Sequence, residues 1–100
     1  MDLFSLKDKV IIITGASGGN GSAIADGLEN YGAKVIRADL PEYDITDKKK
    51  LDLLVEKSLY YSGEINGLVN CAGVTFGNDL FDYTDEDWDK TYQVNLKAPY

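Results

Sequence analysis

Hydrophobic and polar positions follow two different periods along the first third of the chain. Residues 10–13 form an unbroken aliphatic run, which is typical of a strand buried on both faces of a parallel sheet. Apolar residues then recur at helical spacing at Ile24, Leu28 and Tyr31, and Gly32 follows where such a helix would end. The sequence therefore predicts a buried strand that leads, through a short turn, into a helix.

The same alternation continues in the middle of the chain. Residues 34–38 predict a second strand, and apolar positions at helical spacing over residues 51–58 predict a second helix. Thr46 is a suitable N-cap for that helix, and Gly63 is placed to end it.

Two further elements are predicted towards residue 100. Residues 65–70 read as a third strand with a weak beginning, and the acidic residues 85–87, after Thr84, favour the first turn of a third helix. Residues 39–46 have no room for both a helix and a strand, so this segment is either a loop or one short strand near residues 43–45.

The order strand, helix, strand, helix, strand, helix predicts an α/β fold. Such an order implies right-handed crossovers and a parallel sheet flanked by helices. A chain of 100 residues has room for one domain, so residues 1–100 are expected to form a single unit.

Composition excludes several classes of protein. A net charge of −7 disfavours binding to nucleic acid or to anionic membrane surfaces, and the longest aliphatic run is far too short to cross a bilayer. The absence of histidine and the single cysteine, Cys71, exclude a structural zinc site and an internal disulfide. With no signal-peptide pattern at the start, the expected location is the cytoplasm.

A glycine-rich turn joins the first predicted strand to the first helix. Glycines allow backbone to approach a ligand closely, and a helix N-terminus offers unpaired N–H groups to a phosphate. The spacing is neither G-x-G-x-x-G nor a P-loop, and the alternative interpretation is an ordinary surface turn. The position between strand and helix favours phosphate binding by Gly15, Ser17, Gly18, Gly19, Asn20 and Gly21.

Asp39 follows the second predicted strand, 18 residues after Gly21. A carboxylate about 20 residues beyond such a turn can accept hydrogen bonds from the hydroxyls of an adenosine ribose, and it repels a 2′-phosphate. This arrangement favours NAD over NADP. Arg37 lies on the same strand face two residues earlier, where it could pair with Asp39 or assist a phosphate.

Taken together, these motifs resemble the short-chain dehydrogenase/reductase family. Thr14-Gly15, followed by Gly19-Asn20-Gly21, is similar to its T-G-x-x-x-G-x-G motif, although the family usually has isoleucine at the position of Asn20. Three more stretches match in family order: Asp44-Ile45-Thr46-Asp47 resembles D-V-T-D, Asn70-Cys71-Ala72-Gly73 resembles N-N-A-G, and Asn95 begins an N-L-K-A-P stretch.

The resemblance implies roles for these residues. Asp44 and Ile45 are expected at the adenine, Asn70, Ala72 and Gly73 at the strand end beside the cofactor, and Asn95 in an Asn-Ser-Tyr-Lys catalytic tetrad. The family relay is thought to hold a water on the backbone oxygen of that asparagine. Pro99 has no N–H, so an α-helix through this region would leave the Asn95 carbonyl unpaired.

The resemblance also implies a fold and an activity. The expected fold is the N-terminal half of a Rossmann-type doubly wound parallel sheet, truncated before the serine, tyrosine and lysine of the tetrad. The longer parent would be an NAD-dependent oxidoreductase, acting on an alcohol or ketone at a pocket bordered by residues 75–82 and commonly homo-oligomeric, whereas residues 1–100 alone would be inactive. The alternatives are a non-catalytic dinucleotide-binding protein on the same fold and an α/β interaction domain that binds no nucleotide.

Overall fold

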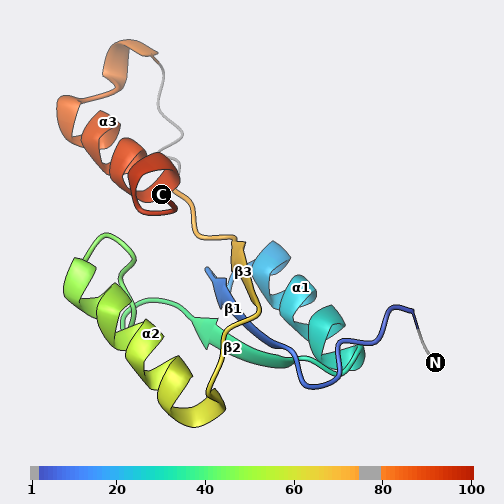
Figure 1. Ribbon diagram of the computed structural model, residues 1–100. Coiled ribbons are helices and arrows are strands. Elements are labelled where there is room, and N and C mark those ends of the chain that lie inside the picture. The colour runs from blue at the N-terminus through green and yellow to red at the C-terminus, as the bar shows by residue number, and fades with distance from the viewer. Residues whose placement is uncertain (1–2, 75–79) are drawn as a thin grey trace.

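The computed structural model describes residues 3–74 and 80–100 of the chain. Three strands form one parallel sheet in the order β2-β1-β3 (Figure 1). The strands are β1 (Val10–Thr14), β2 (Lys34–Ala38) and β3 (Gly67–Asn70). The helices are α1 (Gly19–Asn30), α2 (Lys48–Ser62), the short 3₁₀ helix η1 (Leu80–Asp82), α3 (Asp85–Tyr92) and the π-helix η2 (Gln93–Lys97).

The central strand β1 separates two hydrophobic clusters. Ile12 packs with Leu54 of α2 on one face of the sheet, and Ile13 packs with Ala25 of α1 on the other. Successive side chains of a strand point to opposite faces, so the aliphatic residues 10–13 of β1 can bury both faces of the sheet. Figure 1 shows α1 and α2 on opposite sides of the sheet. The doubly wound parallel fold predicted from the sequence is confirmed.

The helix ends are set by the residues that follow them. Gly32 and Gly63 adopt φ values of 101° and 76°, in the left-handed region that glycine reaches without strain. The N–H of Gly63 donates to the carbonyl of Leu59 at 2.8 Å and closes the last turn of α2. Both glycines therefore end helices, as the sequence predicted.

The N-cap of α2 is not the predicted Thr46. The carboxylate of Asp47 accepts from the N–H groups of Lys49 and Lys50, at 2.9 and 3.4 Å. Thr46 instead donates to Asp44, at 2.9 Å from its N–H and 2.6 Å from its hydroxyl. Because Thr46 binds the carboxylate of Asp44, the cap of α2 is Asp47, one residue later than predicted.

The third strand is shorter than predicted, and the segment before α2 is a loop. β3 begins at Gly67, and Asn66 before it binds Val10 of β1 twice: its N–H donates to the Val10 carbonyl at 2.7 Å, and its Oδ1 accepts from the Val10 N–H at 2.8 Å. Residues 39–47 contain no strand. A turn from the Asp39 carbonyl to the Tyr43 N–H, at 2.8 Å, bends this loop and buries the Tyr43 side chain in the α2 cluster.

The third helix begins with the predicted acidic turn and then changes its period. Thr84 and Asp87 form a reciprocal capping box at the start of α3. From Gln93 the helix widens to π spacing, and its last bond joins the N–H of Ala98 to the carbonyl of Gln93 at 2.8 Å. The prediction that Pro99 leaves the Asn95 carbonyl unpaired assumed α spacing. In π spacing each N–H bonds to the carbonyl five residues earlier, so the donor to the Asn95 carbonyl would come from residue 100.

Among the described residues, no helix combines the length and the apolar character that crossing a bilayer requires. The same part of the chain contains no cluster of three or more cysteine, aspartate or glutamate side chains that could hold a metal ion.

Candidate functional site

A pocket of about 280 Å³ opens at the carboxyl ends of the three strands. Parallel α/β sheets bind ligands at this edge, where the strand order reverses. The turn after β1, the loop after β2, the segment after β3 and the α3–η2 helix all contribute walls. The described lining residues are Gly15, Ser17, Gly18, Asp39, Leu40, Tyr43, Asp44, Ile45, Cys71, Ala72, Gly73, Val74, Lys90 and Val94.

Two glycines let the turn after β1 close tightly. Gly15 has a φ of 66°, and a Cβ on it would lie 2.7 Å from the backbone nitrogen of Ala72. A Cβ on Gly21 would lie 2.1 Å from the carbonyl oxygen of Gly15. Both clashes are with backbone, so neither neighbour can move aside cheaply. These glycines are required by the fold of the turn itself.

Gly19 is a different kind of glycine. A Cβ added there meets no protein atom within 4 Å, so the fold does not require glycine at this position. Gly19 is the first residue of α1, whose first turn carries no acidic side chain and whose N-cap, Gly18, makes no side-chain cap bond. The first N–H groups of a helix have no acceptor within the helix, so those of Gly19, Asn20 and Gly21 are suited to an anion.

Asp39 is fixed against the glycine-rich turn. One oxygen accepts from the N–H of Ser17 at 2.8 Å and from the Ser17 hydroxyl, and the other accepts from the N–H of Leu40 at 2.8 Å. These bonds, of which the bond from the Ser17 hydroxyl has the largest effect, hold the pKa of the Asp39 carboxyl below its ordinary value of 3.8. Asp39 is therefore ionised at neutral pH, half-buried at the mouth of the pocket.

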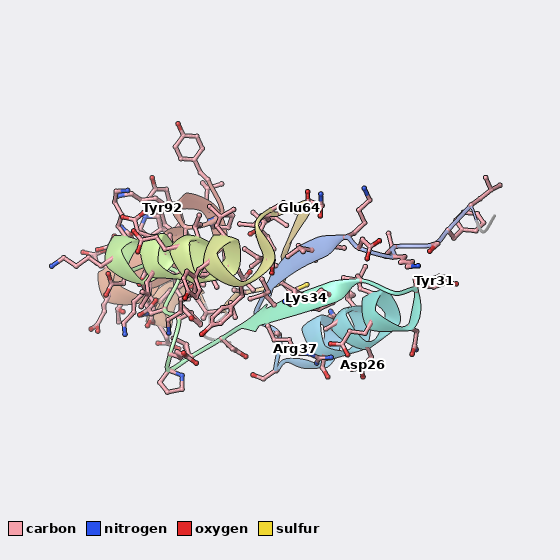
Figure 2. All side chains as sticks on the ribbon, turned by 60° about the horizontal axis from the view of Figure 1, so that its bottom comes forward. Asp26, Tyr31, Lys34, Arg37, Glu64 and Tyr92 are labelled. Atoms are coloured by element: carbon pink, nitrogen blue, oxygen red, sulfur yellow. The ribbon has the colours of Figure 1, made fainter. Side chains whose placement is uncertain are left out.

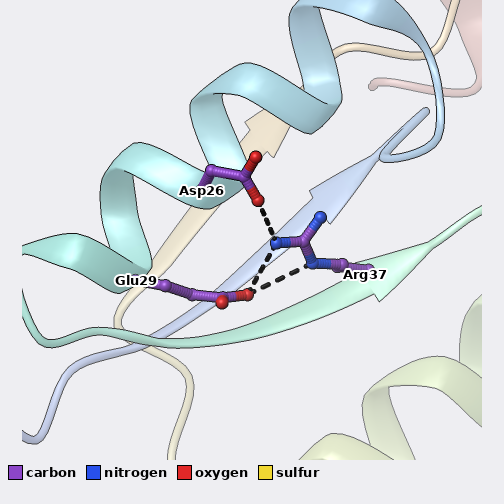
Figure 3. A network of polar contacts seen from close by, with 3 residues as sticks. All are labelled: Asp26, Glu29 and Arg37. Atoms are coloured by element: carbon purple, nitrogen blue, oxygen red, sulfur yellow. Dashed lines mark hydrogen bonds and ion pairs between the residues drawn. The ribbon is translucent and has the colours of Figure 1, made fainter.

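Arg37 neither pairs with Asp39 nor lines the pocket. Its guanidinium lies 2.8 Å from Asp26 and 2.8 Å from Glu29, both on α1 (Figure 3). Figure 2 shows Arg37 beside Asp26 on the side of β2 that faces α1. Val35 packs against the α1 cluster, and its alternate neighbour Arg37 faces the same way. The pairing with Asp39 that the sequence left open is wrong.

Asp44 and Ile45 line the far wall of the pocket. Oδ1 of Asp44 accepts from the hydroxyl of Thr46 at 2.6 Å and from its N–H at 2.9 Å. The bond from the Thr46 hydroxyl is the largest influence that keeps the pKa of Asp44 below its ordinary value, and the positive charge of Lys90 acts in the same direction. The pocket thus has two ionised carboxylates, Asp39 and Asp44, on its strand-end side.

Ala72 and Gly73 reach the pocket, but Asn70 does not line it. The ends of β1 and β3 are joined by Thr14, whose carbonyl accepts from the N–H of Cys71 at 3.2 Å and whose hydroxyl accepts from the N–H of Ala72 at 3.4 Å. Asn70 itself lies opposite Thr14 in the sheet register. Asn70 therefore lies at the end of β3, as predicted, and the bonds that join the two strand ends are made by Thr14 of β1.

Asn95 joins the α3–η2 helix to the segment after β3. Its Oδ1 accepts from the N–H of Val74, and its Nδ2 donates to the carbonyl of Val74, both at 2.8 Å. Both polar atoms of the side chain are thereby engaged with one residue. Gly73 lies alongside, and a Cβ there would approach Asn95 Oδ1 to 3.4 Å. Asn95 borders the pocket through Val74 and does not line it directly.

Several lining residues were not predicted from the sequence. Lys90 and Val94 are four residues apart on the α3–η2 helix and both line the pocket; that spacing was the available signal. Leu40 and Tyr43 belong to the loop whose path the sequence left open. Gly19, Asn20 and Gly21 form the first turn of α1 and do not line the pocket. Of the expected substrate border, residues 75–79 lie outside the described residues.

The sequence profile of the short chain dehydrogenase family matches residues 9–100. The chain belongs to this family. This match confirms the resemblance seen in the sequence.

Curated relatives of this chain are oxidoreductases by name. The chain is 36% identical to an uncharacterised oxidoreductase of Staphylococcus haemolyticus, over 93% of the chain and 48% of the relative. It is 31% identical to an NAD-dependent glycerol dehydrogenase of Listeria innocua, over 97% of the chain and 45% of the relative. The chain spans about half the length of these relatives.

Solved structures show the same fold. The chain superimposes on a 3-ketoacyl-(acyl-carrier-protein) reductase from Brucella melitensis, in complex with NADH, with a TM-score of 0.88. The sequence identity is 27%, and the match covers 96% of this chain and 47% of the reductase.

Proposed function

We propose that the chain forms the cofactor-binding part of an NAD-dependent oxidoreductase that interconverts an alcohol and a ketone or aldehyde. The observation that carries this proposal is an open helix N-terminus at Gly19, directly after the pocket residue Gly18, together with the ionised carboxylate of Asp39 in the same pocket lining. This arrangement suits a ligand that carries an anion and a pair of hydroxyl donors at the separation fixed by the turn.

The residues fit a dinucleotide part by part. The open space at Gly19 and the first N–H groups of α1 would hold the pyrophosphate, and Asp39 would accept from the adenosine ribose. Asp44, Ile45, Ala72 and Gly73 would enclose the adenine. A volume of about 280 Å³ suits a nucleoside more than a whole dinucleotide. Bound NAD would supply the position that accepts the hydride.

The ribose hydroxyls compete with bonds that Asp39 already makes. A carboxylate offers about four acceptor positions, and Ser17 and Leu40 take three of those on Asp39. A ribose that donates two hydroxyls must therefore displace one existing bond, and the rotatable Ser17 hydroxyl is the donor that can turn away. Ser17 would then hold Asp39 in place before binding and release one acceptor position on binding.

NAD is proposed over NADP. A phosphate on the 2′ hydroxyl would face the carboxylate of Asp39, and the nearest strand cation, Arg37, is bound to Asp26 and Glu29. Like charges brought together at a partly buried site are destabilising. The name of the NAD-dependent relative and the NADH in the reductase support the same choice.

Asn95 is proposed to serve catalysis through its main chain. Its side chain is held by Val74, which fixes the position of the Asn95 carbonyl and leaves the amide side chain no free polar atom. The proton chemistry on the substrate would require serine, tyrosine and lysine groups in the longer parent. We therefore expect residues 1–100 alone to bind cofactor without turnover.

The wider setting is part of the same proposal. Residues 1–100 are taken as one NAD-binding domain, and the lone Cys71 favours a cytoplasmic protein. Trp88, Tyr92 and Leu96, spaced by four residues along the α3–η2 helix, are 66%, 44% and 66% exposed. An apolar stripe of this kind supports the expected homo-oligomer of the parent.

Calorimetry with NAD and NADP tests the proposal. The wild-type chain should bind NAD measurably and NADP more weakly. Asp39→Asn should weaken NAD binding by about tenfold, as expected for loss of a charge-assisted hydrogen bond. Asp52→Asn, which removes an exposed carboxylate on α2 far from the pocket, is the matched control and should leave the affinity unchanged. Wild-type protein that takes up neither dinucleotide at millimolar concentration would contradict the proposal.

A further inference from the structure

One wall of the pocket comes from α3, an element that none of the cofactor motifs includes. Lys90 and Val94 lie on the same side of the α3–η2 helix, four residues apart, and both line the pocket. Val94 is 8% exposed, so this side of the helix is seated against the pocket and does not simply face solvent. Asp44 and Ile45 also line this pocket, and the charge of Lys90 acts on the Asp44 carboxylate, so these two side chains lie near each other.

Lys90 is the only cation among the described lining residues. None of the ion pairs within the part of the chain that the structure describes involves it, whereas Arg37, Lys48 and Lys57 are each paired with a carboxylate. Its ammonium therefore remains available to a ligand. The facing carboxylate of Asp44 uses one oxygen for Thr46 and keeps the other for a further donor.

We propose that Lys90 is a specificity-determining residue that, together with Asp44, recognises the adenine base of the dinucleotide. Adenine presents an amino donor beside a ring-nitrogen acceptor. Asp44 supplies an acceptor and Lys90 supplies donors, from two different elements on the same end of the pocket. This inference rests on the proposed dinucleotide function and adds to it a base-reading contact from α3.

The pair also explains how the pocket tolerates two carboxylates. Asp39 and Asp44 would together repel a ligand that carries two phosphates, and one cation offsets half of that charge. A contribution through charge alone would act on any nucleotide diphosphate. A contribution through the base would act only on a purine that carries the matching donor and acceptor, so the two can be separated by changing the base.

The test is calorimetric titration of the full chain with ADP and with UDP. Lys90→Met should weaken ADP binding by about three- to tenfold, the range of a charged hydrogen bond at a partly exposed site, and weaken UDP binding by less than about twofold through the lost charge alone. Lys90→Arg should restore most of the ADP affinity. Lys97→Met, which removes the same charge from the same helix outside the pocket lining, should bind like wild type.

Three outcomes would overturn the inference. Equal ADP affinity in Lys90→Met and Lys97→Met would mean that Lys90 makes no contact with the base. An equal loss for ADP and UDP would reduce its role to general electrostatics. Wild-type protein that binds neither ADP, UDP nor NAD would overturn the proposed function as well. The first two outcomes would overturn only the role of Lys90. Thermal unfolding of each variant shows that the fold is retained.

Discussion

The carboxylate of Asp39 accepts hydrogen bonds from both the N–H and the hydroxyl of Ser17, and so joins the end of β2 to the glycine-rich turn after β1. The two residues are 22 positions apart in the chain. Their contact sets the distance between the acceptor for a ribose and the helix N-terminus for a pyrophosphate, which is the separation that a dinucleotide must match.

This contact makes both stability and cofactor binding sensitive to acid. The pKa of Asp39 is lowered in the folded chain, so its contribution to stability is complete above the unfolded value near 3.8 and is lost as the pH falls through the lower folded value. Ser17→Ala should raise that pKa towards its ordinary value and cost about 1 kcal/mol at pH 7, the usual net worth of one hydrogen bond. Urea unfolding of wild type and Ser17→Ala at pH 7 and at pH 3 measures this cost and its dependence on pH. A difference in unfolding free energy between the two proteins that is as large at pH 3 as at pH 7 contradicts the prediction.

The two kinds of glycine in the turn should respond differently to an added methyl group. Gly21→Ala places a Cβ against the Gly15 carbonyl and should cost about 2 kcal/mol or more of unfolding free energy. Gly19→Ala meets open space, and its stability should change by less than about 0.5 kcal/mol. NAD affinity should nevertheless fall about tenfold in Gly19→Ala, because the methyl group enters the phosphate position. Full NAD binding by Gly19→Ala would place the phosphate elsewhere.

Cofactor choice should depend on Asp39 and not on Arg37. Arg37→Gln breaks contacts to Asp26 and Glu29 on the α1 side, and the ratio of NAD to NADP affinity should change by less than about twofold, as for exposed ion pairs. Asp39→Asn should lower the ratio of NAD to NADP affinity, because the carboxylate that repels a 2′-phosphate is gone. Paired titrations with both dinucleotides measure the ratio, and a large shift in Arg37→Gln would show that this arginine contacts the cofactor.

Asn95 should hold the α3–η2 helix to the sheet. Asn95→Ala removes both hydrogen bonds to Val74 and should lower the unfolding free energy by about 1–2 kcal/mol. The N–H of Val74 loses its acceptor, so its hydrogen exchange should become faster. Lys97→Ala, a change in the same helical segment, is the control and should leave Val74 unaffected. Unchanged exchange in Asn95→Ala would mean that the side chain does not fix this segment.

Much of the fold could be predicted from local patterns. The aliphatic run of β1 required burial on both faces, and Gly32 and Gly63 stood where helices had to end. The N-cap of α2 could not be read in the same way. Thr46 and Asp47 are both good caps, and the choice depends on whether Asp44 draws the threonine away, which is set by the path of the loop.

The candidate site was predictable where one element carries the signal. Turn glycines and the carboxylate at the end of β2 follow from position along the chain. The partner of Arg37 does not, because strand periodicity places Asp39 on the same side but cannot show that α1 covers that side with Asp26 and Glu29. Lys90 was missed for a similar reason: its spacing of four from Val94 places both residues on one helix face, but only the folded chain shows that this face lines the pocket.

The most direct test is to titrate the isotopically labelled chain with NAD and follow its backbone amide resonances. We expect saturable shifts at Ser17, Gly19 and Gly21 and around Asp39 and Asp44, with α2 beyond Leu54 unaffected. Shifts confined to other surfaces, or none at millimolar NAD, would contradict the claim that the strand-end pocket holds the dinucleotide.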